Sequence, residues 1–279
     1  MTYRLLALDL DGTTIAPDGT VRPPTIAAIR RALEHDLMVV FATGRNYAES
    51  KPILDMIGHY PTGIFVGGAV VVETATGEVS HRTGMDAALA VEVVAAVREL
   101  GLSAQCLQEG AGQPSYRVVG DPPEAFRWWC EHKDIAWEPF DGDTLEAHEH
   151  TIRVGLLAPY DTAHTMETLL RDRLGERVYM HNIEVPQQFN VVEIFDPSVN
   201  KWEGIRTVAA RHDIRAEKII AVGDDRNDIH MIEGAGLGVA MGNAKDEIKA
   251  IADRVIGTNG EDGLAAFIHE IVEQHLLTR

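Results

Sequence analysis

Three apolar segments of this chain each run into a loop rich in acidic or hydroxyl side chains. The segments are residues 5–8, 37–41 and 219–222, and the loops are residues 9–14 (DLDGTT), 43–45 (TGR) and 223–228 (GDDRND). Continuous apolar runs are typical of strands in a parallel sheet covered on both faces. Because ligands bind beyond the carboxyl ends of such strands, we expect the three loops to converge on one site.

Helical patterns separate these strands in both outer thirds of the chain. In the first third, helices are expected from residue 23 and over 47–57, followed by a strand at 64–66 and a hairpin over 70–79. In the last third, helices are expected over 201–212, 244–252 and 264–277 and strands at 219–222 and 237–240. This alternation predicts an α/β fold with a doubly wound, mostly parallel, Rossmann-like sheet.

The middle of the chain follows a different pattern. A clear amphipathic helix is expected over 86–100, and the strand and helix patterns beyond it are short and weak. We therefore predict a discontinuous core domain formed by residues 1–83 and 187–279, interrupted by an inserted α+β domain over 84–186. The apolar run at 191–194 is assigned to the core sheet.

Charge and cysteine content exclude several classes of protein. The chain has 43 acidic and 25 basic residues in 279, a net charge of −18, which disfavours nucleic acids and anionic membranes as partners. No apolar run approaches the roughly 18 residues that a membrane span requires. The two cysteines, Cys106 and Cys130, form no Cys-x-x-Cys pair, so neither a disulfide framework nor a zinc site is expected. The expected location is a reducing cytoplasm.

Two aspartates open the first loop. Asp9 and Asp11 are one residue apart at the end of a strand, so their side chains are expected to project to the same side. Adjacent carboxylates need a nearby cation or a shared proton, and an aspartate can attack a phosphoryl group. Gly12 permits a tight turn behind them. The alternative is an ordinary Asp-Gly turn without chemistry.

The loop after the strand at 219–222 supplies a second set of oxygen ligands. Its acidic residues are Asp224, Asp225 and Asp228, with no histidine or cysteine among them. Such a set favours Mg²⁺ over zinc or copper. Asp225 is better explained as a cap at a helix N-terminus. Asp224 is therefore the stronger candidate ligand, with Asp228 and Asn227 supporting it.

A lysine and a threonine complete the candidate set. Lys201 opens a helix, where the helix dipole disfavours a cation, so it needs another reason for its position. Neutralising a phosphate and a carboxylate cluster is one such reason, and a solvated surface lysine is the alternative. Thr43 ends a strand before Gly44, and its hydroxyl and N–H are suited to phosphoryl oxygens.

These motifs, in this order and spacing, resemble the haloacid dehalogenase superfamily of phosphohydrolases, and in particular its Cof-type members with a class IIB cap. Residues 239–244 (VAMGNA) and 258–263 (TNGEDG) are further matches to these members. The resemblance covers both outer thirds, and the subgroup inserts its cap where the pattern changes here. It implies a core of that superfamily with an inserted cap that closes over the substrate.

The resemblance also implies a role for each candidate residue. Asp9 would attack phosphorus and form an aspartyl-phosphate. Asp11 would protonate the leaving oxygen and then activate water, with its backbone carbonyl on Mg²⁺. The carboxylates of Asp9 and Asp224 would bind the metal, with Asp228 behind them. The implied phosphate-binding residues are Thr43, Gly44, Lys201 and Asn227. Gly67 stands where the family usually has asparagine, and that contact would be missing.

The implied activity is that of a Mg²⁺-dependent phosphatase acting on a small phosphorylated metabolite, such as a sugar phosphate. A mannosyl-3-phosphoglycerate-type phosphatase or a phosphomutase of the same fold is an alternative. A non-catalytic regulator that binds Mg²⁺ and phosphate is another, although Asp11 argues against it because a phospho-acceptor needs no leaving-group acid. The substrate is expected to be the main partner, and the chain a monomer or a homodimer.

Overall fold

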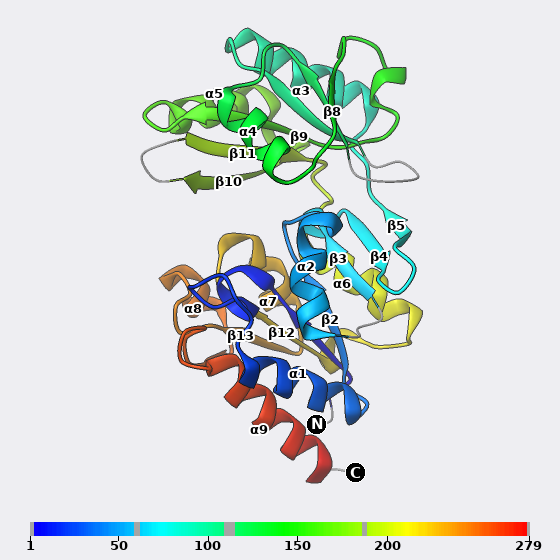
Figure 1. The fold of residues 1–279 in the computed structure, drawn as a ribbon, viewed down its shortest axis with the longest axis vertical. Coiled ribbons are helices and arrows are strands. Elements are labelled where there is room, and N and C mark those ends of the chain that lie inside the picture. The colour runs from blue at the N-terminus through cyan, green and yellow to red at the C-terminus, as the bar shows by residue number, and fades with distance from the viewer. Residues whose placement is uncertain (1–2, 59–61, 109–114, 186–188, 278–279) are drawn as a thin grey trace. The chain divides into compact units, whose positions relative to one another are not determined.

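The computed structural model describes residues 3–58, 62–108, 115–185 and 189–277. The chain divides into two compact units (Figure 1): unit 1 is Met1–Arg82 with Asn200–Arg279, and unit 2 is Thr83–Val199. Among the described residues, each helix is too short or too polar to cross a membrane.

Unit 1 is built on a sheet with the strand order β14-β13-β12-β1-β2-β3-β4-β5. Its strands are β1 (Leu5–Leu8), β2 (Met38–Ala42), β3 (Thr62–Phe65), β4 (Val70–Glu73), β5 (Glu78–Arg82), β12 (Ile219–Gly223), β13 (Leu237–Ala240) and β14 (Arg254–Val255). Pairing is parallel from β14 to β3 and antiparallel between β3, β4 and β5. The predicted mostly parallel α/β sheet is confirmed.

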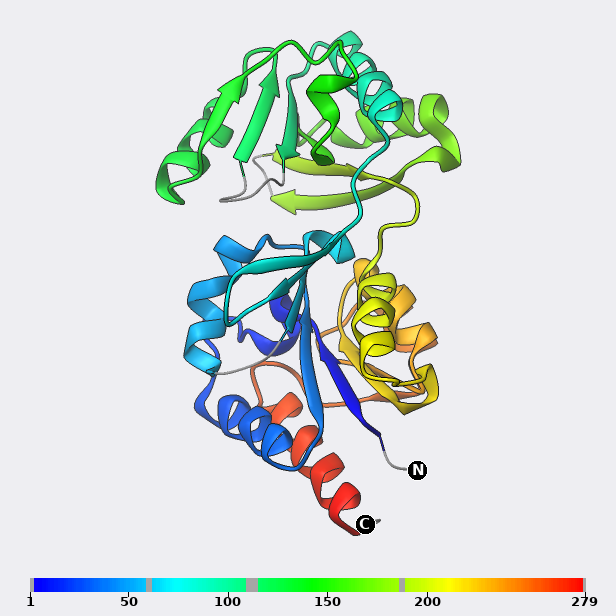
Figure 2. The same ribbon diagram turned by 90° about the vertical axis from the view of Figure 1, so that its right-hand side faces the viewer.

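Helices cover both faces of this sheet. They are α1 (Pro23–Glu34), α2 (Tyr47–Ile57), α6 (Lys201–Arg211), α7 (Ile229–Gly234), α8 (Asp246–Ile251) and α9 (Gly263–Leu277). The yellow helix α6 lies on one face and the blue α1 and red α9 on the other (Figure 2). One side of β1, at Leu5 and Ala7, packs against α6 and α7, and all four β1 residues are buried. This two-sided burial explains why the strand sequences are continuously apolar.

Unit 2 contains a separate sheet with the order β10-β11-β9-β6-β7-β8. Its strands are β6 (Ala104–Gln108), β7 (Ser115–Val119), β8 (Trp137–Pro139), β9 (Thr151–Pro159), β10 (Tyr179–Val185) and β11 (Phe189–Phe195), and its helices are α3 (Ala87–Glu99), α4 (Glu124–His132) and α5 (Ala163–Leu174). Pairing is antiparallel except between β7 and β8. Side chains of α3 and α5 form one apolar cluster with the strands, so unit 2 has the predicted α+β character.

The structure places the second boundary between the units later than the sequence pattern does. The run at 191–194 lies in β11, which pairs with β9 and β10 in unit 2 rather than joining the core sheet. Unit 2 consequently ends at Val199 and not near residue 186, whereas its start at Thr83 is within one residue of the expected position. An apolar run shows that a strand is buried, but it does not show which sheet the strand joins.

Candidate functional site

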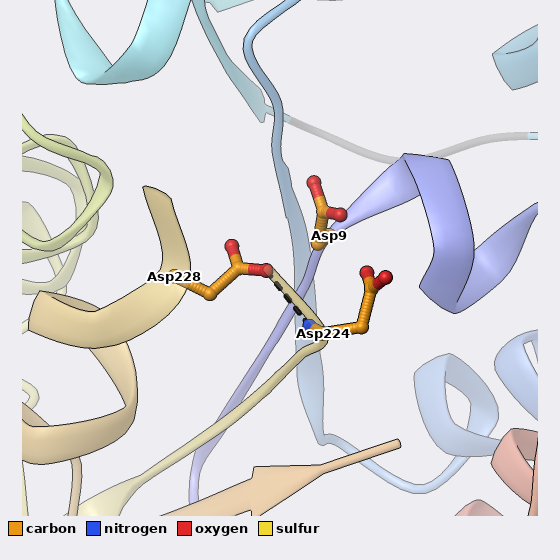
Figure 3. A group of neighbouring side chains, drawn as sticks. All are labelled: Asp9, Asp224 and Asp228. Atoms are coloured by element: carbon orange, nitrogen blue, oxygen red, sulfur yellow. Dashed lines mark hydrogen bonds between the residues drawn. The ribbon is translucent and has the colours of Figure 1, made fainter. Parts of the chain in front are cut away.

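Three neighbouring strands of unit 1 bring their carboxyl ends to one place. Leu8 of β1 is paired with Phe41 of β2 and with Val222 of β12, so the loops after these strands start side by side. There one carboxylate oxygen from each of Asp9, Asp224 and Asp228 lies within 4.8 Å of the other two (Figure 3). The predicted convergence of loops therefore places three candidate aspartates in one cluster.

Asp9 is held by the turn that it opens. Its N–H donates to the Val222 carbonyl at 3.1 Å, and its own carbonyl accepts the Thr14 hydroxyl at 2.6 Å. The turn passes through Gly12 at φ +75°, where an added Cβ would overlap the Asp224 carboxylate. Glycine is thus required at this position both for the backbone conformation and for the close approach of the two loops.

Lys201 lies inside the cluster and not at the surface. It is the first residue of α6, and its side chain is 1% exposed. Its Nζ donates to Asp9 Oδ1 and to Asp228 Oδ1, each at 2.6 Å. Two carboxylates therefore compensate the unfavourable position of this cation at the start of a helix, as the sequence predicts.

Asp228 connects the lysine to the second acidic loop. Its Oδ2 accepts the backbone N–H groups of Asp224 at 2.8 Å and Asp225 at 3.1 Å, and its side chain is fully buried. Both of its oxygens are therefore occupied by protein donors. The Asp225 side chain accepts the N–H of Arg226 at 2.6 Å, which is the capping contact expected for it.

The cluster carries more negative than positive charge. Its three carboxylates face one ammonium group, which leaves two negative charges when all are ionised. Burial, reinforced by the charges of Asp228 and Asp224, raises the pKa of Asp9 well above its usual range in spite of Lys201. Burial and the charge of Asp228 raise the pKa of Asp224 to about 7. Burial acts to lower the pKa of Lys201, but the carboxylates of Asp228 and Asp9 have a larger opposite effect, and the pKa is raised.

These features fit a divalent cation with a preference for oxygen ligands. Lys201 donates a hydrogen bond to one Asp9 oxygen, and the Thr13 hydroxyl donates one to an Asp224 oxygen at 3.1 Å. The other oxygen of each of these two carboxylates accepts no hydrogen bond from the described residues. A cation here would offset the two excess charges and lower both raised pKa values. The cluster therefore suggests a metal site, with Asp9 and Asp224 as the side chains able to hold the ion.

Asp11 does not lie in this cluster. Its carboxylate is 53% exposed and accepts two hydrogen bonds from the Arg45 guanidinium, from Nε at 2.7 Å and Nη2 at 2.5 Å. Asp9 and Asp11 thus have different partners, Lys201 and Arg45. Because β1 ends at Leu8, the strand alternation on which the expectation of a shared side rests does not extend to Asp11.

Thr43 is buried beside the cluster, but its main chain is already engaged. Its N–H donates to the Ile64 carbonyl at 2.9 Å, so the prediction that this N–H binds a phosphoryl oxygen is wrong. The Thr43 hydroxyl oxygen accepts the N–H of Arg45 at 3.2 Å, which leaves its hydrogen to donate elsewhere. A Cβ placed on Gly44 would lie 3.8 Å from Nδ2 of Asn227, and the Asn227 Oδ1 is buried with no partner among the described residues. The structure thus puts Asn227 next to Gly44.

The loop after β3 supports these residues through contacts that the sequence pattern does not predict. Gly67 adopts φ +67° and donates its N–H to the Thr43 carbonyl at 3.0 Å. Val66, a β-branched residue, has φ +53°, a strained conformation for such a side chain. A Cβ on Gly68 would overlap the Asn200 carbonyl, directly before Lys201. The two consecutive glycines, Gly67 and Gly68, are the sequence feature from which this close packing could be predicted.

Comparisons with known proteins agree with the geometry. The profile of the family described as haloacid dehalogenase-like hydrolase matches residues 6–268. The 5-amino-6-(5-phospho-D-ribitylamino)uracil phosphatase YitU of Bacillus subtilis is 30% identical over 278 residues, 95% of this chain and 96% of that protein. The pyridoxal phosphate phosphatase YbhA of Escherichia coli is 26% identical over 275 residues, 96% and 98% of the two chains. The solved structure of the subclass IIB sugar phosphatase BT4131 has a similar fold, with a TM-score of 0.76 at 21% identity over 96% of this chain and 98% of that one.

Proposed function

The chain belongs to the haloacid dehalogenase-like hydrolase family, and on this basis we propose that it is a Mg²⁺-dependent phosphatase of small phosphorylated metabolites. The observation that carries the proposal is the Asp9 carboxylate, buried between Lys201 and Asp224. An aspartate in this position can attack phosphorus while neighbouring cations neutralise the charge of the phosphoryl group.

The proposed reaction has two steps. An Asp9 oxygen forms a bond to phosphorus as the bond from phosphorus to the leaving oxygen breaks, and water then breaks the Asp9–phosphorus bond to release phosphate. Lys201, with the Thr43 hydroxyl and Asn227, binds the phosphoryl oxygens. Mg²⁺ bound to Asp9 and Asp224 would supply further positive charge.

We assign the proton transfers to Asp11, following the family resemblance. Its carboxylate would give a proton to the leaving oxygen in the first step and take one from water in the second. Because that carboxylate is bonded to Arg45 in this structure, the role requires Asp11 to exchange its guanidinium partner for the substrate.

The names of the two relatives point to a narrower class of substrate. The two relatives act on a ribitylaminouracil phosphate and on pyridoxal phosphate, both phosphomonoesters of compounds that contain a nitrogen heterocycle. We propose a substrate of this class ahead of a sugar phosphate. A mannosyl-3-phosphoglycerate-type phosphatase, a phosphomutase and a non-catalytic regulator remain the competing functions.

A panel of phosphorylated metabolites, scored for release of inorganic phosphate with Mg²⁺ present, tests this proposal. The panel pairs heterocyclic phosphomonoesters with sugar phosphates, and each reaction is repeated with excess chelator. Phosphate release that depends on Mg²⁺ supports the phosphatase. Isomerised product without phosphate release would indicate a mutase, and tight binding without turnover would indicate a regulator.

We also propose a cytoplasmic location and a monomeric or homodimeric state. Both cysteines, Cys106 and Cys130, are free and buried, which suits a reducing compartment. Light scattering on the purified protein would test the proposed oligomeric states, since a larger assembly would contradict both.

A further inference from the structure

A short segment of unit 1 lies next to the second acidic loop and holds its backbone. The segment is residues 241–245, between β13 and α8. Within it the N–H of Met241 donates to the Gly223 carbonyl at 3.0 Å, and the N–H of Lys245 donates to the Asp224 carbonyl at 3.2 Å. These two contacts fix the loop that carries one of the two proposed metal ligands.

The same segment reaches the turn that follows Asp9. The Asn243 Nδ2 donates to the Gly12 carbonyl at 2.8 Å, although the two residues are 231 positions apart in the sequence. The Asn243 Oδ1 accepts the N–H of Asn259 at 3.0 Å, and the Asn259 Nδ2 donates to the Ile15 carbonyl at 2.7 Å. The Asn243 amide therefore holds the middle of the turn over residues 9–15, at Gly12, and the Asn259 amide holds its end, at Ile15.

The loop that carries Asn259 is itself well anchored. The Arg22 guanidinium donates to both carboxylate oxygens of Asp262, at 2.6 and 3.1 Å, and to the Gly260 carbonyl at 2.9 Å. Asp262 adopts φ +58°, a left-handed conformation that needs such support. Asn243 and Asn259 lie in the two late sequence motifs that matched the family without a role assigned to them.

The position of the Asp9 turn decides how the two ligand loops meet. Gly12 lies so close to the Asp224 carboxylate that a side chain there would overlap it, and Thr13 bonds that carboxylate at 3.1 Å. A displacement of the turn by a few tenths of an ångström would therefore change the separation of the Asp9 and Asp224 carboxylates. A metal ion with strict geometric demands is sensitive to such a change.

We propose that Asn243 is a positioning residue for the metal site: its side-chain amide links the Asp9 turn to the segment that holds the Asp224 loop, and so sets the affinity for Mg²⁺. The inference rests on the proposed Mg²⁺ dependence. Asn243 itself touches neither the carboxylates nor the phosphoryl group in this assignment, and it acts through the Gly12 carbonyl.

Calorimetric titration of Mg²⁺ into the metal-free protein tests this inference. Asn243→Ala and Asn243→Leu remove both hydrogen bonds. The dissociation constant for Mg²⁺ is expected to rise about 3-fold to 10-fold, the range that follows when the free energy of one such hydrogen bond is lost from the metal-bound state. At saturating Mg²⁺ the kcat of both variants should approach the wild-type value. Thr258→Val is the matched control, because it removes a contact within the neighbouring loop, Thr258 Oγ1 to Glu261 at 2.8 Å, and leaves Asn243 intact.

The outcomes separate this inference from the proposed function. If the wild-type protein binds no Mg²⁺, the proposed function fails. If the wild type binds Mg²⁺ and both Asn243 variants bind it equally well, the positioning role is refuted, even when their melting temperature falls. Asn259→Ala provides a second variant, since it removes the contact to Ile15 at the end of the turn and should also weaken Mg²⁺ binding.

Discussion

Replacing Lys201 with methionine should strongly destabilise unit 1 in the absence of metal. Methionine keeps much of the length of the lysine side chain but removes the ammonium group that donates to Asp9 and Asp228 at 2.6 Å. Lys201 is 1% exposed and its two partners are 6% and 0% exposed, so water cannot replace the lost contacts.

The magnitude follows from this burial. Removing one partner of a buried ion pair typically costs about 3–5 kcal/mol, because the remaining charge stays buried without compensation. Lys51→Met is the matched control, since Lys51 pairs with Asp55 at 2.7 Å but the two side chains are 53% and 60% exposed. An exposed pair of this kind should contribute about 0.5 kcal/mol or less.

The cost of Lys201→Met should also depend on pH and on metal. Lys201 has a pKa above its ordinary value of 10.5, so it is charged throughout the range from pH 5 to 8 and its own contribution is constant there. In the variant, Asp9, whose pKa is already raised by burial, takes up a proton as the pH falls. The difference in unfolding free energy between variant and wild type should therefore become smaller from pH 8 to pH 5, and Mg²⁺ should reduce this difference as well.

Hydrogen exchange of peptides from β1 and β12, followed along a urea series, measures the free energy of unfolding of unit 1. An equal or smaller loss of unfolding free energy for Lys201→Met than for Lys51→Met, at pH 8 without Mg²⁺, would refute this prediction. A loss that did not change between pH 8 and pH 5 would contradict the proposed role of the buried carboxylates.

Three further predictions concern the same cluster and the cysteines. Gly12→Ala should abolish Mg²⁺ binding measured by calorimetry. The control is Gly19→Ala, at φ +81° with nothing within 4 Å of its added Cβ, which should cost only about 1 kcal/mol of stability. Equal Mg²⁺ binding by both variants would contradict the packing described for Gly12. Because the pKa of Asp224 is about 7 without metal, protons should compete with Mg²⁺ and its affinity should fall as the pH drops below about 7; an affinity that stays constant from pH 8 to pH 5.5 would rule this out. Burial raises the pKa of Cys106 to about 12 and that of Cys130 to about 11, so neither thiol should react with a disulfide reagent at pH 8 until the protein unfolds, which the rate of absorbance change reports.

Much of unit 1 could be predicted from the sequence because its main signals are local. The run at 5–8 is continuously apolar because β1 is covered on both faces, and the polar loop after it falls at the carboxyl end because β1, β2 and β12 are parallel. Lys201 could be identified because a lysine at the start of a helix opposes the dipole.

The remaining features depend on contacts that no short stretch of sequence contains. The placement of β11 in unit 2 is decided by its pairing with β9 and β10. Asp11 bonds Arg45 because the chain turns immediately after β1, and the Thr43 N–H is taken by β3, a contact fixed by the register of the sheet. The link from Asn243 to Gly12 joins residues from opposite ends of the chain.

The release of inorganic phosphate by Asp9→Asn, compared with wild type on the best substrate of the panel, is the decisive test of Asp9 as the nucleophile. The substitution keeps the size of the side chain but removes the nucleophilic carboxylate. We expect a loss of about 10³-fold or more in kcat, with unchanged circular dichroism. Asp18→Asn, the same change at an exposed aspartate that bonds Thr20, should leave the rate at the wild-type level. Near-normal phosphate release by Asp9→Asn would contradict the assignment of Asp9 as the nucleophile.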